Sequence, residues 1–183
     1  DPRHGGGRQS EKAKDDLVEL IQIGGREKLF FKPFHVDIAL LPHFYLTVAQ
    51  RLTAGYDAFV INRRTIAPRS ARVADLPLLY ADPGEKHPGY DCFVFRRELC
   101  SRFSLGLLCL GAAWVGRGLL ANLVTHARRF AEFGDDHLTF HVGDAQTWRE
   151  DALQDYQAHN RREYERLVAE LEERHGPFAP ELR

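Results

Sequence analysis

A histidine and an aspartate follow an apolar segment in LFFKPFHVDIALLPHFY, residues 29–45. The segment before His35 is typical of a buried strand, and Pro42 is typical of the first turn of a helix, where its missing N–H costs nothing. An imidazole and a carboxylate at a strand end can bind a divalent cation, although imidazole suits Mn²⁺ better than Mg²⁺. His35 and Asp37 are therefore candidate metal ligands. The alternative is that His35 is a polar strand-end residue without a metal.

Polar residues also lie at the ends of other apolar segments. They are Asn62, Arg63 and Arg64 after residues 57–62, Asp91, Arg96 and Arg97 around residues 90–95, and His141 and Asp144 around residues 137–142. In open α/β sheets, ligands bind outside the carboxyl ends of the strands, so these side chains should converge. Carboxylates and imidazoles beside arginines suit a divalent cation that bridges a diphosphate. The alternative is that strand ends are polar because they meet water.

Alternating helices and strands must position these residues. We expect a flexible leader at residues 1–10, a helix at 10–23 and a strand at 28–31. Further strands are expected at 57–62, 90–95 and 137–142, helices at 41–52, 112–130 and 146–174, and a loop at 63–88. The alternation predicts an α/β fold with an open, mostly parallel or mixed sheet and flanking helices.

Length and charge limit the classes of protein. The 183 residues, 44% of them hydrophobic, suffice for one domain over residues 11–183, complete or truncated. A net charge of −1 gives no general attraction to nucleic acid or to an anionic membrane. The longest apolar run, residues 103–115, is shorter than the ~20 residues of a membrane span. We therefore expect a cytoplasmic protein that binds no nucleic acid and spans no membrane.

The long C-terminal helix has an apolar seam. Its members recur at three- and four-residue steps and are Leu153, Tyr156, Asn160, Tyr164, Leu167 and Leu171. We expect this seam to pack on the sheet or on a second protomer, which makes a homodimer one of the open alternatives. The cysteines Cys92, Cys100 and Cys109 lack the paired C-x-x-C spacing of a zinc site, and we expect reduced, buried thiols.

Several segments resemble a known family. FHVDIALLPHFYLTVAQRLTAGYDAFVINRRTI resembles the middle of a GT-A type nucleotide-diphospho-sugar glycosyltransferase, in which a buried strand ends in an Asp-x-Asp type motif. HPGYDCFVFRREL and LGLLCLGAAWVGRGLLANL are similar to the later part of a group of glycosyltransferases of this fold. LTFHVGDAQTW resembles their late His-bearing strand, so that the resemblance covers about residues 27–165.

This resemblance implies a metal site. Asp37 would be the final acid of a motif that holds Mn²⁺ or Mg²⁺ on the diphosphate of a nucleotide-sugar donor, and His35 would occupy the position of its first acid. His141, with Asp144 beside it, would be a late metal ligand. The alternative is that His141, between Phe140 and Val142, is a core histidine with its hydrogen bonds satisfied.

The resemblance also implies a catalytic residue and substrate contacts. Asp91 would orient the acceptor hydroxyl or act as its general base; otherwise it is a turn residue. Candidate substrate-binding residues are Arg63, Arg64, Trp114 and Arg117. Trp114 could instead be a core residue, and Arg63 and Arg64 could simply begin a solvated loop.

Two departures from the family pattern keep a second function open. Val115 follows Trp114 where the relatives carry Asp, and only one helix fits before the strand at 28–31, where GT-A domains have a β-α-β unit. Either upstream sequence is missing, as the absence of any Met also suggests, or the protein is a reduced member. We expect a metal-dependent glycosyltransferase that moves a sugar to an acceptor hydroxyl. The alternative is a non-catalytic GT-A-like module that binds carbohydrate or protein.

Overall fold

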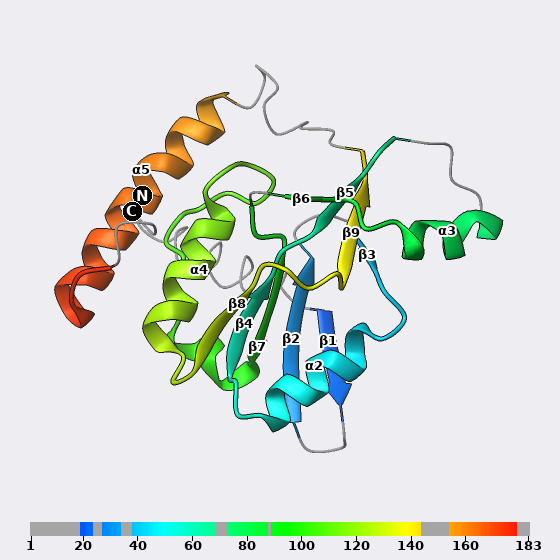
Figure 1. Ribbon diagram of the computed structural model, residues 1–183. Helices are drawn as coiled ribbons and strands as arrows, with labels where there is room; N and C mark the ends of the chain where they lie inside the picture. The colour runs from blue at the N-terminus through cyan, green and yellow to red at the C-terminus, as the bar shows by residue number, and fades with distance from the viewer. Residues whose placement is uncertain are drawn as a thin grey trace. The chain divides into compact units, whose positions relative to one another are not determined.

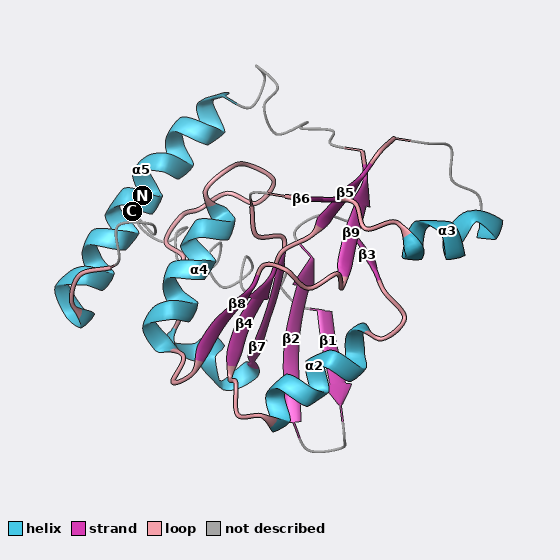
Figure 2. Ribbon diagram, viewed as in Figure 1, coloured by secondary structure: helices cyan, strands magenta, loops and turns pink. Residues whose placement is uncertain are grey.

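The computed structural model describes residues 19–23, 27–33, 38–68, 73–87, 89–143 and 154–178. The chain divides into two compact units. Unit 1 comprises Asp1–Glu19, Arg97–Ala127 and Gln146–Arg183, and unit 2 comprises Leu20–Arg96 and Arg128–Ala145. Figure 1 labels the helices and strands, and Figure 2 colours them by type.

The first sheet of unit 2 has the strand order β1-β2-β7-β4-β8 within the described residues. Its strands are β1 (Glu19–Ile23), β2 (Glu27–Pro33), β4 (Ala58–Ile61), β7 (Cys92–Arg96) and β8 (Phe130–Phe133). Strand β7 is antiparallel to both β2 and β4, whereas β4 and β8 are parallel. The sheet is therefore mixed.

The second sheet of unit 2, as far as the structure describes it, has the order β3-β9-β5-β6. Its strands are β3 (Ala39–Leu40), β5 (Arg64–Ile66), β6 (Glu85–Lys86) and β9 (Thr139–Val142). The β3–β9 and β5–β6 pairs are antiparallel, and β5 is parallel to β9. Unit 2 also contains α2 (Phe44–Thr53), a 3-10 turn (Val73–Asp75) and α3 (Leu76–Ala81).

The core of unit 2 lies between α2 and the first sheet. All residues of β4 are buried, as are Cys92–Phe95 of β7. Phe59 packs in one cluster with Phe44 and Val48, which project from α2. This helix begins after Pro42 and buries a side chain every fourth residue at Phe44, Val48 and Leu52, so that one stripe faces the sheet.

Unit 1 contains α4 (Val115–His126), α5 (Gln154–His175) and a 3-10 helix (Arg97–Arg102). Helix α5 packs on α4, with Leu167 next to Gly118. The buried residues of α5 are Asn160, Tyr164, Leu167, Val168 and Leu171. Tyr156, which the seam was expected to bury, is 53% exposed, and Leu153 lies outside the described residues. In the part of the chain that the structure describes, no helix is both long and apolar enough to cross a membrane.

Three expected elements were wrong. Glu19–Ile23 is a strand, because pairing in the sheet next to β2 outweighs the helical spacing of this segment. The helix expected at 112–130 ends at His126; the backbone N–H groups of Arg128 and Arg129 donate to the buried Asp57 carboxylate, and β8 follows. The loop expected at 63–88 contains β5, α3 and β6.

The cysteines differ in burial. Cys92, in β7, is fully buried, as expected, whereas Cys100 and Cys109 are only partly buried. All three are free thiols. Burial, followed by the charge of Asp91, raises the pKa of the Cys92 thiol far above its ordinary value. Cys92 is therefore a neutral, packed side chain.

Candidate functional site

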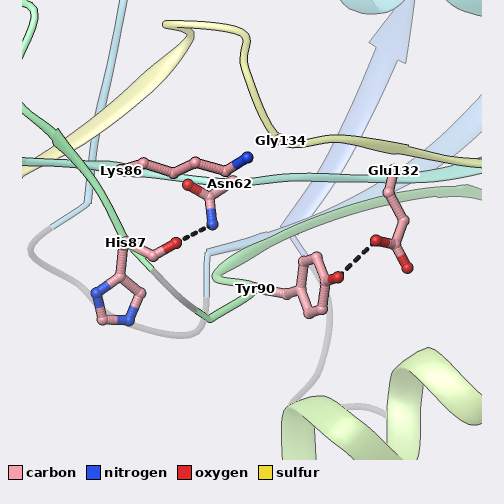
Figure 3. A pocket seen from close by; sticks show the side chains of 6 residues that line it. All are labelled: Asn62, Lys86, His87, Tyr90, Glu132 and Gly134. Carbon is pink, nitrogen blue, oxygen red and sulfur yellow. Dashed lines mark hydrogen bonds between the residues drawn. The ribbon is translucent and has the colours of Figure 1, made fainter. Parts of the chain in front are cut away.

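A pocket of about 270 Å³ lies in unit 2 at the ends of two parallel strands. Its lining residues are Asn62, Lys86, His87, Tyr90, Glu132 and Gly134 (Figure 3). Asn62 directly follows β4, and Gly134 directly follows the parallel strand β8. Because β7 is antiparallel to β4, Tyr90, shortly before β7, reaches the same edge. The pocket therefore occupies the position outside carboxyl strand ends that binds ligands in α/β proteins.

Asn62 connects the end of β4 to the loop that carries Tyr90. Its amide nitrogen Nδ2 donates a hydrogen bond to the backbone oxygen of His87 (Figure 3). It donates a second one to the backbone oxygen of Gly89 at 2.7 Å. The Asn62 Oδ1 atom is buried and has no hydrogen-bond partner among the described residues. An unsatisfied buried acceptor costs about 1–3 kcal/mol, so a donor from water or a ligand is favoured here.

Tyr90 and Glu132 form a short hydrogen bond in the pocket. The Tyr90 hydroxyl donates to Glu132 Oε2 at 2.5 Å. Burial, and then the hydrogen bond to Glu132, raises the pKa of Tyr90 to about 12. The phenol is therefore protonated at neutral pH and remains the donor of this pair. Glu132 itself is an exposed residue of β8.

Lys86 lines the pocket, and a second cation, Arg64, is its neighbour in the sheet. Arg64 and Lys86 are directly opposite each other in the antiparallel β5–β6 pair. Lys86 Nζ donates to Asp135 Oδ1 at 3.0 Å, and Arg64 Nη2 donates to the Asp135 backbone oxygen at 3.4 Å. The side chains of Lys86 and Asp135 are 53% and 90% exposed, so their ion pair is weak and can exchange partners.

Arg63, His87 and Asp91 form a more buried cluster at the same edge. Arg63 Nε is 3.3 Å from Asp91 Oδ2, and the two side chains are only 8% and 10% exposed. His87 Nε2 lies 3.8 Å from the same carboxylate, and its Nδ1 is 3.3 Å from Arg63 Nη2. The cluster holds the loop before β7 against the end of β4.

The structure thus brings together Arg63, Arg64 and Asp91 from the set expected at strand ends. His141 is 6% exposed in β9, and its Nδ1 lies 2.5 Å from the Gly143 backbone oxygen.

The expected metal site is not formed by the described residues. Across the described ranges, no group of three or more His, Cys, Asp or Glu could hold a metal ion. His35, Asp37 and Asp144 lie outside these ranges, and metal binding by His35 and Asp37 stays a prediction.

Trp114 and Arg117 belong to unit 1. Trp114 is the N-cap of α4 and has a left-handed backbone with φ of 79°, which is unusual for a bulky residue. Its ring packs against Tyr164 at a centroid distance of 5.3 Å with a tilt of 34° between the rings, and Arg117 Cζ lies 5.2 Å from the Trp114 ring centroid. These contacts account for both side chains as packing partners. A role for them in substrate binding stays a prediction.

Five of the pocket residues were not candidates in the sequence: Lys86, His87, Tyr90, Glu132 and Gly134. Lys86 lies in the segment that was expected to be a loop, and Glu132 follows a helix that was expected to continue to residue 130. The segment RFAEF has no two-residue alternation, because its phenylalanines are three residues apart, so the sequence offers no periodic signal for β8. Without that strand, nothing places Glu132 beside Tyr90.

Comparisons with known proteins give limited information. No protein-family model matches the chain, and no solved structure matches it. Caffeate CoA-transferase of Acetobacterium woodii is 49% identical over 41 residues, which are 22% of this chain. The matched stretch spans only 8% of that relative's length. A match this short does not establish a family.

Proposed function

We propose that this chain is part of a glycosyltransferase that moves a sugar from a nucleotide-diphosphate donor to an acceptor hydroxyl, with the unit 2 pocket as its donor site. The observation that carries the proposal is the cationic pair of Arg64 and Lys86 beside a pocket lined with hydroxyl, amide and carboxylate groups. A sugar diphosphate joins an anionic group to a polyhydroxylated group. Adjacent cationic and hydrogen-bonding surfaces match both parts.

The cationic pair suits a diphosphate for an electrostatic reason. Like charges directly opposite each other in a sheet are unfavourable, and Asp135 offsets the repulsion only through an exposed contact. A diphosphate can replace that carboxylate and accept charge-assisted hydrogen bonds from Arg64 and Lys86. During transfer, the bond from the sugar to the diphosphate breaks, and the same cations stabilise the charge that develops on the leaving group.

In this proposal Asp91 is a positioning residue. Its carboxylate lies 3.3 Å from Arg63 Nε and is largely buried, so action as a general base requires that a buried ion pair separates first. The contacts of Asp91 favour a different role, which is to hold Arg63 and His87 in place beside the loop that precedes β7.

A second candidate is a module that binds coenzyme A, because a 41-residue stretch is 49% identical to a caffeate CoA-transferase. Coenzyme A also contains a nucleoside diphosphate, so the cationic pair suits either ligand. The acceptor groups of Asn62 and Glu132 favour the sugar, because a hydroxylated ring brings several donors to a small pocket.

Thermal shift and calorimetric titration of the 183-residue protein separate the two candidates. The probes are UDP, UDP-glucose, GDP-mannose and coenzyme A, each with and without Mn²⁺. We expect sugar nucleotides to raise the melting temperature because they bind only the folded state. A shift with coenzyme A alone supports the second candidate, and no shift with any probe contradicts both.

Variants locate the diphosphate. Lys86→Ala is expected to weaken UDP binding about tenfold, equal to ~1.4 kcal/mol, because it removes one charge-assisted contact. The matched control is Arg128→Ala, which removes a 90% exposed cation of the same unit that does not line the pocket. Equal effects of the two substitutions would place the diphosphate elsewhere.

The variant Asp37→Asn tests the metal site. If Asp37 holds the metal, this variant should lose the effect of Mn²⁺ on binding and otherwise retain UDP binding.

A further inference from the structure

Two residues of the unit 2 pocket, Asn62 and Glu132, carry side-chain oxygens that accept hydrogen bonds. Asn62 Oδ1 is buried without a partner in the described part of the chain, and Asn62 as a whole is 4% exposed. Its orientation is fixed, because Nδ2 already donates to two backbone oxygens. Glu132 adds carboxylate oxygens to the same wall. A ligand group that donates hydrogen bonds can therefore satisfy this side of the pocket.

This requirement distinguishes the two ends of a sugar diphosphate. A diphosphate bridged between two organic groups is fully ionised at neutral pH and has no hydrogen to donate. Each hydroxyl group of a sugar can donate one hydrogen bond and accept another. The acceptors of Asn62 and Glu132 therefore match the sugar, while the diphosphate belongs beside Arg64 and Lys86.

The size of the pocket agrees with a single ring. Its volume of about 270 Å³ is slightly below the 300–1,000 Å³ typical of pockets for drug-sized ligands. Gly134 forms part of the wall next to Lys86, because a Cβ atom at this position would lie 3.0 Å from Lys86 Nζ and 3.3 Å from Lys86 Cε. One monosaccharide ring is an appropriate occupant of this volume.

The charge of Glu132 further restricts which sugar fits. Tyr90 donates a neutral hydrogen bond to it and does not cancel its charge. Lys86 is the nearby cation of the lining, but it contacts Asp135 and, in the proposed complex, the diphosphate. Any group inside so small a pocket lies within the ~8 Å screening length of the Glu132 carboxylate. A second carboxylate on the ligand is therefore repelled.

We infer that the pocket holds the sugar ring of the donor and that Glu132 selects neutral sugars against acidic ones, an inference that rests on the proposed function. Asn62 Oδ1 and Glu132 accept hydrogen bonds from ring hydroxyls. Glu132 is a specificity-determining residue, because it penalises a uronic acid by like-charge repulsion.

The test uses ligand pairs that differ by one group. UDP-glucose and UDP-glucuronate differ only in a CH₂OH or a carboxylate at C6, and UDP-galactose and UDP-galacturonate form a second pair. Calorimetric titration gives the ratio of dissociation constants within each pair, with UDP as the reference for the diphosphate. We expect the protein to bind the neutral member about tenfold more tightly in at least one pair.

Variants assign the selectivity to this pocket. Glu132→Gln keeps an acceptor for the Tyr90 hydroxyl and removes the charge, so it should reduce the ratio to about one, and any change in the affinity for the shared UDP part cancels in this ratio. Glu85→Gln is the control, because Glu85 is an exposed carboxylate one residue from Lys86 that does not line the pocket.

The outcomes separate the inference from the proposed function. UDP-sugars that bind no better than UDP, or a preference for neutral sugars that survives in Glu132→Gln, overturn the inference and leave the function in place.

If UDP itself does not bind, the proposed function fails. The pocket is then tested by saturation-transfer NMR with methyl glucoside and methyl glucuronoside. Preference for the neutral glycoside, abolished in Glu132→Gln, supports a sugar pocket without nucleotide binding, and its absence overturns the inference.

Discussion

Arg64 and Lys86 face each other across the antiparallel β5–β6 pair, and each donates a hydrogen bond to Asp135. Two cations in register repel each other, and the acidic loop residue that follows β8 lowers the cost. The contact between Lys86 and Asp135 is exposed at both ends and so contributes little to stability. The positive charge of Arg64 and Lys86 beside the pocket is therefore only weakly neutralised by Asp135.

Asp135→Asn should therefore increase anion binding. The substitution removes the negative charge that competes with a ligand for Lys86, and we expect the affinity for UDP to rise about threefold to tenfold. The free energy of unfolding should change by no more than about 0.5 kcal/mol, because the residue is exposed. Calorimetric titration at low salt measures the first effect and urea unfolding the second. A lower affinity for UDP would mean that Asp135 contributes to the ligand site.

The residues at this edge of the first sheet could be predicted, because the local pattern of apolar and polar residues marks where a strand ends. The apolar segments 57–62 and 90–95 predicted two strands, observed at Ala58–Ile61 and Cys92–Arg96, and the polar residues Asn62 and Asp91 do reach one edge. The rule that ligands bind at carboxyl strand ends needs no knowledge of strand order.

The rest of the pocket depends on pairings between distant residues. Glu132 reaches the pocket because β8 is parallel to β4, about 70 residues earlier in the chain, and the buried Asp57 carboxylate helps to begin that strand. Lys86 reaches it through the two-residue strand β6, which is too short to give a periodic signal. The strand Glu19–Ile23 has helical spacing and is a strand through its place in the sheet.

Tyr90 should be the last or nearly the last of the six tyrosines to ionise. Its pKa is raised to about 12 by burial and then by the hydrogen bond to Glu132, and burial also raises the pKa of Tyr164. An alkaline titration followed by near-ultraviolet absorbance should lose one late step in Tyr90→Phe. Glu132→Gln should move that step toward the ordinary tyrosine value near 10, because the neutral amide no longer opposes the phenolate. An unchanged titration in both variants would contradict the short hydrogen bond.

The raised pKa of Tyr90 also determines how the stability of the protein changes with pH. The folded pKa of Tyr90 lies above the unfolded value, so the unfolded state loses its proton first as pH rises. The contribution of this residue to stability is therefore complete below about pH 10 and is lost between about pH 10 and pH 12. Tyr90→Phe should show less loss of stability over that range in urea unfolding.

Asn160 should be critical for the stability of unit 1. This fully buried side chain accepts a hydrogen bond from the Cys109 N–H at 2.7 Å and donates to the backbone oxygens of Cys109 and Ala113. Asn160→Ala leaves these groups unpaired, so we expect a loss of about 3 kcal/mol in the free energy of unfolding. Arg162→Ala, at an exposed position of the same helix, should cost no more than about 0.5 kcal/mol. Urea unfolding measures both, and similar losses in the two variants would contradict the structural role of Asn160.

Mild acid should destabilise the protein through two histidines. Burial, and then the positive charges around each ring, lowers the pKa of His126 and of His137 below the ordinary value of 6.5. The groups facing His126 are His175, Arg102 and Arg174. As pH falls below about 6.5, the unfolded chain takes up protons that the folded chain still excludes, so the free energy of unfolding decreases until the folded pKa is passed.

His126→Gln and His137→Gln should each reduce the difference in stability between neutral and mildly acidic pH. Urea unfolding at the two pH values and NMR titration of the imidazole signals provide the measurements. A histidine variant with the same pH dependence as the original protein would show that the folded chain does not hold that ring in its neutral form.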